Sequence, residues 1–284
     1  MARLLCFGDG YVAQALAPLA RARGFHVAGT RRQHGPLRYA DGQLSPELIA
    51  AIAQATHILI SIPPHEGEEV LAAAVGLHAP RGAWIGYLST SGVYGDYAGA
   101  SVTEDMPCRA ATPRTQARLH AEYLWRQVGA QVFRLSGIYG PGRSAFDAIR
   151  AGRAQRIHKP GHLFNRIHVA DIAAGLMASM LASTPGEIFN LADDLPAPHA
   201  QVLAYAYGLL GQPVPPVVPY AQAQLSPMAA EFYAGCRQVD SAKIKRFHGL
   251  TWKFPTYRHG LATILQRESI MAVAACAQPP KNMQ

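Results

Sequence analysis

Three things that the sequence has little of narrow the class of protein. Charged residues make up only 15% of the 284, against 49% hydrophobic residues, which excludes an intrinsically disordered chain. The four cysteines lie far apart with no CxxC pair, which argues against a zinc site or a disulfide framework. No apolar run approaches the roughly 20 residues that cross a membrane, and the first is too short for a signal peptide. We therefore expect a folded cytoplasmic protein without a membrane segment.

The charge of the chain is unbalanced but not concentrated. Lys and Arg number 26 against 18 Asp and Glu, a net charge of +8 that is scattered along the sequence. A scattered excess favours a small anionic ligand over nucleic acid. The 12 histidines show no metal-ligand spacing, so we expect no metal site. The expected partner is a small-molecule substrate, and a monomer and a homodimer both stay open.

Apolar strands alternate with amphipathic helices through the first two thirds of the chain. Strands are expected at 3–7, 25–30, 57–62, 83–90, 131–135 and 187–191. Helices are expected directly after the first strand and at 46–54, 66–76, 113–128 and 168–182. This alternation predicts an α/β fold with a Rossmann-like, doubly wound parallel sheet.

The pattern changes near residue 196. Two further helices are expected at 198–210 and 256–267, on either side of a proline-rich stretch. We therefore predict an NAD(P)-binding Rossmann domain over 1–195, with parts of 137–168 contributing to the pocket. A small, mainly helical C-terminal cap domain follows over 196–267, and a flexible tail over 268–284.

The motif GDGYVA, which follows the first expected strand and opens a helix, predicts a dinucleotide site. Gly8 permits the tight turn, Gly10 lets the backbone approach a pyrophosphate, and Ala13 packs helix against strand. Tyr11 and Val12 begin the helix whose N-terminus would face the phosphates. The alternative is a turn that holds no ligand.

No carboxylate ends the second expected strand, where NAD-binding folds place an Asp or Glu on the ribose. Thr30, Arg31 and Arg32 stand there instead. Two guanidiniums suit a 2′-phosphate, which makes NADP the expected cofactor and NAD the less favoured one. The alternative is an ordinary pair of solvated charges. Asp9 counts against a bound phosphate unless its carboxylate points away.

Several later segments together resemble a known family. A hydroxyl cluster at 88–96 ends a strand where open α/β sheets bind ligands. The segments RLSGIYGPGR at 134–143 and RIHVADIA at 166–173 resemble the RxxxxYGP and HVxDxA motifs of extended short-chain dehydrogenases/reductases. The SIPP segment at 61–64 and the IHKPG segment at 157–161 make the chain most similar to atypical, YeeZ-like NAD-dependent epimerase/dehydratase proteins.

This resemblance implies an NAD(P)-binding protein with oxidoreductase or epimerase/dehydratase-like chemistry on a small polar or sugar-like substrate. Cofactor contacts are also expected from Ser61, Pro63 and Arg118. Substrate contacts are expected from Tyr139, Lys159, Asn165 and Arg166. For Tyr139 the alternative is a structural turn, and for Lys159 a solvated basic loop.

The catalytic positions of the family match only in part. Thr90 stands at the Ser/Thr position, with Ser91 as the alternative register. The Tyr and Lys of the family's YxxxK pair are replaced by Arg114 and Arg118. A guanidinium cannot release a proton at neutral pH, so Arg114 cannot replace the tyrosine. Arg118, one helical turn further on, can still hold a ribose or an anionic substrate.

Another group must move the proton if the chain is an enzyme. Tyr94, Tyr139, His65 and His168 are the candidates by position, although Tyr94 suits core packing as well and His168 suits a helix cap. The expected catalytic set is Thr90, Ser91, Tyr94 and Arg118. Two functions stay open: an NADP-dependent enzyme with a non-standard active site, and a non-catalytic NADP(H)-binding sensor or regulatory partner protein.

Overall fold

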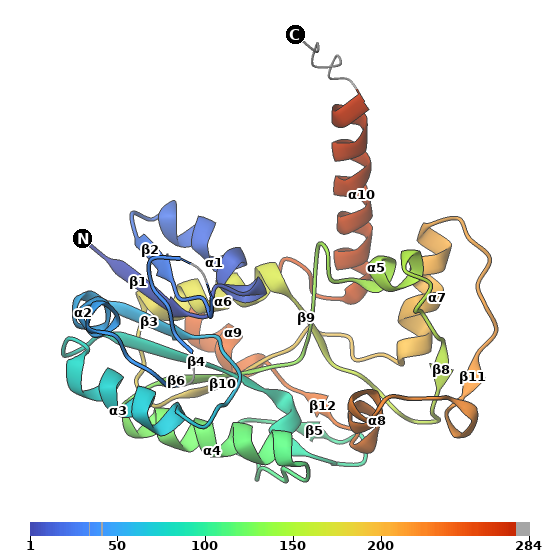
Figure 1. Ribbon diagram of the computed structural model, residues 1–284. Coiled ribbons are helices and arrows are strands. Elements are labelled where there is room, and N and C mark those ends of the chain that lie inside the picture. The colour runs from blue at the N-terminus through green and yellow to red at the C-terminus, as the bar shows by residue number, and fades with distance from the viewer. Residues whose placement is uncertain (34, 41, 277–284) are drawn as a thin grey trace.

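A parallel sheet of six strands forms the centre of the computed structural model, which describes residues 1–33, 35–40 and 42–276 (Figure 1). The strand order is β2-β1-β3-β4-β6-β10. The strands are β1 (Arg3–Phe7), β2 (His26–Gly29), β3 (His57–Ile60), β4 (Trp84–Thr90), β6 (Gln131–Leu135) and β10 (Ile188–Leu191). Every pairing is parallel, so the expected doubly wound sheet is confirmed.

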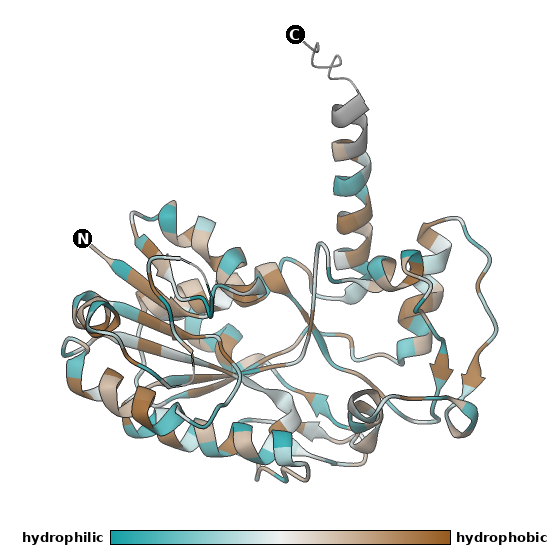
Figure 2. Cartoon of the chain, viewed as in Figure 1, coloured by the Kyte–Doolittle hydropathy of each residue, from teal (hydrophilic) through white to brown (hydrophobic). Residues whose placement is uncertain are grey.

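Helices cover both faces of the sheet because successive strand side chains point in opposite directions. Leu4 and Cys6 of β1 belong to the core under α1, α6 and α9, whereas Leu5 and Phe7 belong to the core under α2, α3 and α4. The helices are α1 (Tyr11–Arg21), α2 (Pro46–Gln54), α3 (Glu68–His78), α4 (Pro113–Gln127), α6 (Val169–Leu181) and α9 (Ala242–His248). Figure 2 shows hydrophobic residues along the strands and mixed hydrophobic and hydrophilic residues on these helices.

A further, smaller core lies beside the sheet and is formed by α5, α7 and α10 (Figure 1). The elements of this region are α5 (Ala145–Arg150), β8 (Ile157–His158), α7 (His199–Leu209), β11 (Val218–Pro219), the 3₁₀ helix η2 (Tyr220–Gln222), α8 (Pro227–Ala234) and α10 (Tyr257–Cys276). Both expected C-terminal helices are present as α7 and α10. No helix in the described part of the chain is long and apolar enough to cross a membrane.

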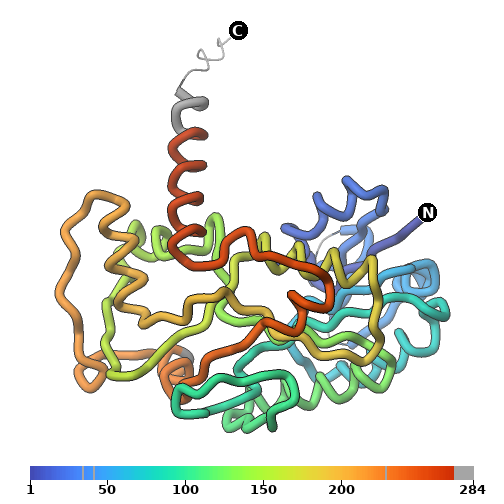
Figure 3. The backbone as a smooth tube through the Cα atoms, turned by 180° about the vertical axis from the view of Figure 1, so that it is seen from behind, coloured from blue at the N-terminus to red at the C-terminus, as the bar shows by residue number. Residues whose placement is uncertain are grey.

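The division into sheet and cap differs from the expected boundaries in three places. Helix α5 and strand β8 precede residue 196 yet belong to the cap, whereas α9 contacts β10 and α6 of the sheet domain. Helix α10 continues to Cys276, so residues 268–276 of the expected tail are helical and project from the body (Figures 1 and 3). Residues 277–284 of that tail lie outside the described residues.

Short strand pairs connect the two regions. They are β5 (Ser101–Val102) with β12 (Gln238–Val239), and β7 (Gly137–Tyr139) with β9 (Arg166–His168). Another short element, the 3₁₀ helix η1 (Ser91–Tyr94), follows β4 directly. These pairs bring segments far apart in the sequence to the carboxyl end of the sheet.

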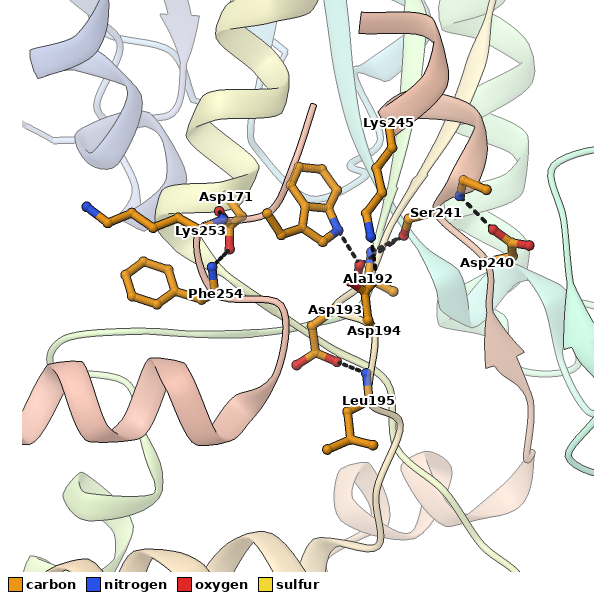
Figure 4. A network of polar contacts seen from close by, with 12 residues as sticks. Asp171, Ala192, Asp193, Asp194, Leu195, Asp240, Ser241, Lys245, Lys253 and Phe254 are labelled. Atoms are coloured by element: carbon orange, nitrogen blue, oxygen red, sulfur yellow. Dashed lines mark hydrogen bonds and ion pairs between the residues drawn. The ribbon is translucent and has the colours of Figure 1, made fainter. Parts of the chain in front are cut away.

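The segment between α9 and α10 is fixed to the sheet domain by a polar network (Figure 4). The carboxylate of Asp171 accepts the backbone N–H groups of Lys253 and Phe254 at 2.8 and 3.0 Å. The indole of Trp252 donates to the carbonyl of Ala192, just after β10, at 2.8 Å. At the start of α6, Nδ1 of His168 accepts the N–H of Ala170 at 3.1 Å, which confirms the helix-cap alternative for this histidine.

Candidate functional site

A cavity of about 570 Å³, here the first cavity, opens at the carboxyl ends of the sheet strands and extends to the cap. The strand order reverses between β1 and β3, the position where doubly wound sheets bind ligands. The walls of the first cavity come from the start of α1, the ends of β3, β4 and β6, the start of α4, and the cap. Residues that matter below are Gly10, Tyr11, Val12, Ser61, Thr90, Ser91, Arg114, Arg118, Arg143, Asn165, Glu231, Phe232 and Arg237.

The fold requires a glycine at the first glycine position of the GDGYVA motif but not at the second. Gly8 has φ +94°, and a Cβ there would lie 2.9 Å from Cγ2 of Ile62, so the fold itself requires glycine. Gly10 has φ −93°, and a Cβ there would meet nothing within 4 Å. Neither its backbone nor its packing requires glycine, yet Gly10 lines the first cavity as the N-cap of α1. The absent side chain leaves the N-terminus of α1 open to close approach from the first cavity.

Thr30 supports this turn from below. Its side chain is buried, and its Oγ1 accepts the N–H of Gly8 at 3.0 Å. Thr30 was expected to contact a cofactor, but its hydroxyl is used inside the fold. Its role is to hold the glycine turn in place.

The expected pair of free arginines after β2 is in fact one paired and one unpaired side chain. Arg31 donates from Nη2 and Nε to Oδ2 of Asp9, at 2.6 and 3.1 Å. The Arg31 guanidinium therefore offsets part of the negative charge that Asp9 adds to the glycine turn. Arg32 is exposed and makes no hydrogen bond or ion pair within the described residues.

The hydroxyl cluster after β4 contributes Thr90 and Ser91 to the first cavity. Oγ1 of Thr90 accepts the N–H of Gly92 at 3.1 Å and so begins η1. Of the two residues expected from the segment after β3, Ser61 lines the cavity, whereas Pro63 is exposed and does not.

Arg118 is held at the end of β4. Its Nη1 donates to the carbonyl of Leu88 at 2.9 Å and to the hydroxyl of Tyr87 at 3.1 Å. It lines the first cavity and has no carboxylate partner within the described residues. These bonds fix the guanidinium while its charge stays uncompensated.

Arg114, at the position of the family's tyrosine, forms a bridge to the cap. Its Nε lies 3.1 Å from Oε2 of Glu231, and its guanidinium carbon lies 5.2 Å from the ring centre of Phe232. Both partners belong to α8. No sequence pattern predicts this contact, because the paired residues are 117 positions apart.

None of the four expected proton donors lines the first cavity. Tyr94 is fully buried, its hydroxyl donates to Oδ1 of Asn190 at 2.8 Å, and burial raises its pKa to about 12. Burial also raises the pKa of Tyr139, and it lowers the pKa of His168 to about 4. Nε2 of His65 lies 3.2 Å from the hydroxyl of Tyr39. The structure therefore does not support Tyr94, the favoured candidate, as the proton donor.

Two expected substrate contacts are engaged elsewhere. Nζ of Lys159 donates to the carbonyl of Tyr233 at 2.6 Å and lies outside the first cavity. Asn165 lines this cavity, but its amide donates to the carbonyl of Arg237 and accepts the N–H of Val239, both at 2.8 Å. Lys159 thus joins two segments of the cap, whereas Asn165 joins the segment before β9 to the segment of β12.

Arg237 is a cavity residue that sequence reasoning missed. Its Nη1 donates to the carbonyl of Gly95 at 2.7 Å, whereas its Nε is buried without a partner among the described residues. Burial lowers the pKa of this guanidinium, and no carboxylate in the described part of the chain lies within ion-pair distance of it. Its position after α8 carries no motif, so only the fold reveals it.

Tyr139 and Arg166, the remaining expected substrate contacts, line a neighbouring space instead, the second cavity. The hydroxyl of Tyr139 donates to the carbonyl of Thr256 at 3.4 Å. In the described part of the chain, no group of three or more His, Cys, Asp or Glu side chains is arranged to hold a metal ion.

Comparison with known proteins finds similar solved structures. No family model and no curated protein matches it. A functionally unknown conserved protein from Silicibacter pomeroyi is 38% identical with a TM-score of 0.86, covering 94% of this chain and 99% of that one. A candidate NAD-dependent epimerase/dehydratase from Methylobacillus flagellatus is 23% identical, with a TM-score of 0.72 and coverages of 94% and 99%.

A further similar structure is the human epimerase family protein SDR39U1 with NADPH, at 18% identity, a TM-score of 0.73 and coverages of 94% and 99%. At this level of identity the likeness concerns the fold. The resemblance stated from the sequence motifs agrees with these structures. The chain therefore belongs to the same family as the Silicibacter pomeroyi protein, and its fold is that of the NAD-dependent epimerase/dehydratase and short-chain dehydrogenase/reductase proteins.

Proposed function

We propose that the chain binds NADP(H) and carries out oxidoreduction or epimerase-like chemistry on a small anionic substrate. The observation that carries the proposal is Gly10, a glycine required neither by packing nor by backbone, at a helix N-terminus inside a large cavity. Proteins of the same fold have been solved with such cofactors: SDR39U1 with NADPH, and a dTDP-glucose 4,6-dehydratase from Bacillus anthracis with NAD.

The nucleotide end of the first cavity comprises Gly10, Tyr11 and Val12, and Arg32, which does not itself line the cavity, follows the Arg31 that pairs with Asp9 of the glycine motif. The backbone N–H groups at the start of α1 have no helical partners and suit a pyrophosphate. Arg32, a cation without an ion-pair partner among the described residues, would recognise a 2′-phosphate, and the Arg31 guanidinium offsets the charge of the Asp9 carboxylate. This arrangement favours NADP over NAD.

The reaction end of the first cavity comprises Thr90, Ser91, Arg118 and Arg237. A bound nicotinamide would supply or accept a hydride there. Arg118 is fixed at the end of β4 and suits a ribose hydroxyl or a substrate anion, while Thr90 and Ser91 can donate to a substrate oxygen. Among residues 1–33, 35–40 and 42–276, no carboxylate pairs with Arg118 or Arg237, so an anionic substrate is favoured electrostatically.

The source of the proton separates the two candidate functions. Within the described residues, the first cavity is lined by no His or Cys, and Tyr11 is its single tyrosine, with the hydroxyl donating to the carbonyl of Pro141 at 3.0 Å. Two carboxylates also line this cavity: Asp96, whose pKa is lowered by hydrogen bonds from the N–H groups of Cys236 and Ala98, and Glu231, which pairs with Arg114. With both carboxylates engaged in this way, an enzyme with this site would take its proton from water or from the substrate. The same absence favours the second candidate, an NADP(H)-binding protein that does not catalyse.

Calorimetry with NADPH and NADH, followed by NADPH fluorescence, tests both candidates. We expect NADPH to bind more tightly than NADH. NADPH is then mixed with a panel of keto acids. Oxidation of NADPH that depends on one of these compounds supports the enzyme, whereas NADPH binding without oxidation by any of them supports the non-catalytic protein. Absence of binding heat with both nucleotides contradicts the proposal as a whole.

A further inference from the structure

Helix α8 of the cap forms part of the wall of the first cavity and lies next to the sheet domain (Figures 1 and 3). Glu231, Phe232 and Ala234 of α8 line this cavity, and so does Arg114 at the start of α4. At this point the cavity is therefore bounded by the sheet domain on one helix and by the cap on another. A change in the separation of α4 and α8 would change the access to the cavity.

A salt bridge joins these two helices. Nε of Arg114 lies 3.1 Å from Oε2 of Glu231. The guanidinium carbon of Arg114 also lies 5.2 Å from the ring centre of Phe232, within the range of a cation–π contact. These three side chains form the α4–α8 bridge.

The α4–α8 bridge lies where the first cavity meets solvent. The side chains of Arg114 and Glu231 line the cavity, yet they are 51% and 33% exposed. Phe232 also lines the cavity and is 52% exposed. Because all three side chains face both the cavity and the solvent, the α4–α8 bridge lies at an entrance of the cavity.

The two ends of α8 are held differently. After α8, the N–H of Cys236 donates to Oδ1 of Asp96 at 2.8 Å, and β12 pairs with β5. A Cβ at Gly235 would lie 3.0 Å from the carbonyl oxygen of Gly95, so this end packs closely on the segment after η1. Before α8, residues 223–226 make hydrogen bonds only with η2 and with α8, among the described residues. The C-terminal end of α8 is therefore anchored to the sheet domain, and its N-terminal end is not.

The remaining polar contacts of α8 stay within the cap. Nζ of Lys159 donates to the carbonyl of Tyr233 at 2.6 Å, and Nε2 of His162 lies 3.2 Å from the carbonyl oxygen of Phe232. Within the described part of the chain, the pair of Arg114 with Glu231 is the one ion pair or hydrogen bond that joins α8 to the sheet domain. The α4–α8 bridge therefore holds α8 against α4.

The strength of such contacts suits an element that opens and closes. A partly exposed ion pair shifts an equilibrium by about twofold to fivefold. A cation–π contact at an exposed site has an effect of similar size. Contacts of this strength favour the closed position of α8 and leave an open position populated.

We propose that the α4–α8 bridge closes an entrance of the first cavity and that its opening controls the rates at which a ligand enters and leaves. Elements that close over a site set the rate of ligand exchange in many proteins. This assignment rests on the proposed function, because NADP(H) is the ligand whose passage is measured. Arg114 thereby has a use that needs no proton transfer, which its guanidinium cannot perform at neutral pH.

Hydrogen exchange of the ligand-free full chain tests the α4–α8 bridge without a nucleotide. In Arg114→Met and in Glu231→Gln, the amides of residues 227–234 should exchange about twofold to fivefold faster than in the wild type. The reason is that a helix of eight residues depends on packing for its stability. The amides of β4 and α6 should not change.

Arg150→Met is the matched control for this measurement. The pair of Arg150 with Glu268 has a similar exposure, 47% and 33%, and neither residue lines the first cavity. This variant should leave the exchange of residues 227–234 unchanged. Unchanged exchange of these residues in both Arg114→Met and Glu231→Gln overturns the proposal.

Stopped-flow fluorescence of NADPH measures passage through the entrance. Each of the two bridge variants should raise both the association and the dissociation rate constant about twofold to fivefold, so that the dissociation constant stays within about twofold of the wild type. Arg114→Met removes a positive charge and Glu231→Gln a negative one, so a parallel rise in both excludes an electrostatic cause. The double variant should match Arg114→Met, because both lack the same contact.

The two proposals fail in different ways. A rise in the dissociation rate constant alone would show direct binding of the nucleotide by these side chains and overturns the proposal for the entrance. NADPH binding with unchanged rate constants in both variants also overturns it and leaves the proposed function intact. Absence of NADPH binding in the wild type contradicts the proposed function, whereas the exchange of residues 227–234 still decides whether the bridge holds α8 closed.

Discussion

The nucleotide end of the first cavity is built from one stretch of chain, whereas its reaction end collects side chains from β4, α4 and the cap. At the nucleotide end, the residues from Gly8 to Arg32 keep a motif whose geometry can be recognised from spacing alone. At the reaction end, Arg114 stands where the family has a tyrosine and is paired with Glu231 of the cap. Under the proposed function, the chain would therefore keep nucleotide binding while lacking the tyrosine of ordinary family catalysis.

The glycine motif gives the largest expected effect. Gly10→Ala should lower NADPH affinity at least about 100-fold and change stability little, because the added Cβ meets only the space that a phosphate would fill. Gly8→Ala should instead destabilise the fold by about 2 kcal/mol or more, since φ is +94° and Ile62 lies too close. Calorimetry and urea unfolding measure the two effects. Equal loss of stability in both variants would contradict this division.

The pH dependence of stability separates a helix cap from a catalytic acid. Burial lowers the pKa of His168 to about 4. Between about pH 6.5 and 4, His168 is therefore protonated in the unfolded chain and neutral in the folded chain. The contribution of His168 is complete above pH 6.5 and is lost as the pH falls, by up to about 2 kcal/mol after allowing for solvent screening. Urea unfolding of the wild type and His168→Asn at pH 7 and 4.5 checks this. If the protein turns over a substrate, a pH-rate profile whose midpoint differs between the wild type and His168→Asn would contradict a purely structural role of His168.

The two arginines after β2 give a smaller effect that sharpens cofactor choice. Arg32→Ala should weaken NADPH about tenfold and leave NADH unchanged, because this free guanidinium is the expected partner of the 2′-phosphate. Arg31→Ala should weaken both nucleotides, since it leaves the Asp9 carboxylate uncompensated near the phosphates. Calorimetry of the two variants with both nucleotides distinguishes them. A loss of NADPH affinity confined to Arg31→Ala would reverse the assignment.

The reaction end should show the smallest effects. Arg114→Ala should change the unfolding free energy by less than about 1 kcal/mol, because its pair with Glu231 is partly exposed. NADPH affinity should stay within about twofold of the wild type, since the nucleotide end is unaltered. Thermal unfolding and calorimetry measure both quantities. A large loss of NADPH affinity would show that the two ends are coupled through the cap.

The sequence predicted the sheet domain well because its signals are local. The helix expected at 46–54 and the strand expected at 131–135 have the same bounds as α2 and β6. Apolar periodicity, a capping serine before α2 and turn residues suffice for such elements. The cap was less predictable: α8 and α9 are short, and α5 joins the cap from a distant part of the chain.

The candidate site divides in the same way. Gly10 was recognisable from its spacing, and so was the absence of a tyrosine at position 114. The bridge from Arg114 to Glu231 and the buried guanidinium of Arg237 depend on tertiary contacts and carry no sequence motif. The structure does not support the prediction of Tyr94 as a proton donor for the same reason. The sequence pattern of an aromatic residue after a strand is the same whether its hydroxyl contacts a ligand or, as here, a buried side chain.

A crystal structure of the chain with NADP tests the central claim most directly. The account predicts the pyrophosphate within hydrogen-bond distance of the backbone N–H groups at the start of α1, and the 2′-phosphate beside Arg32. A pyrophosphate bound anywhere else, with the space in front of Gly10 filled by water, would contradict it.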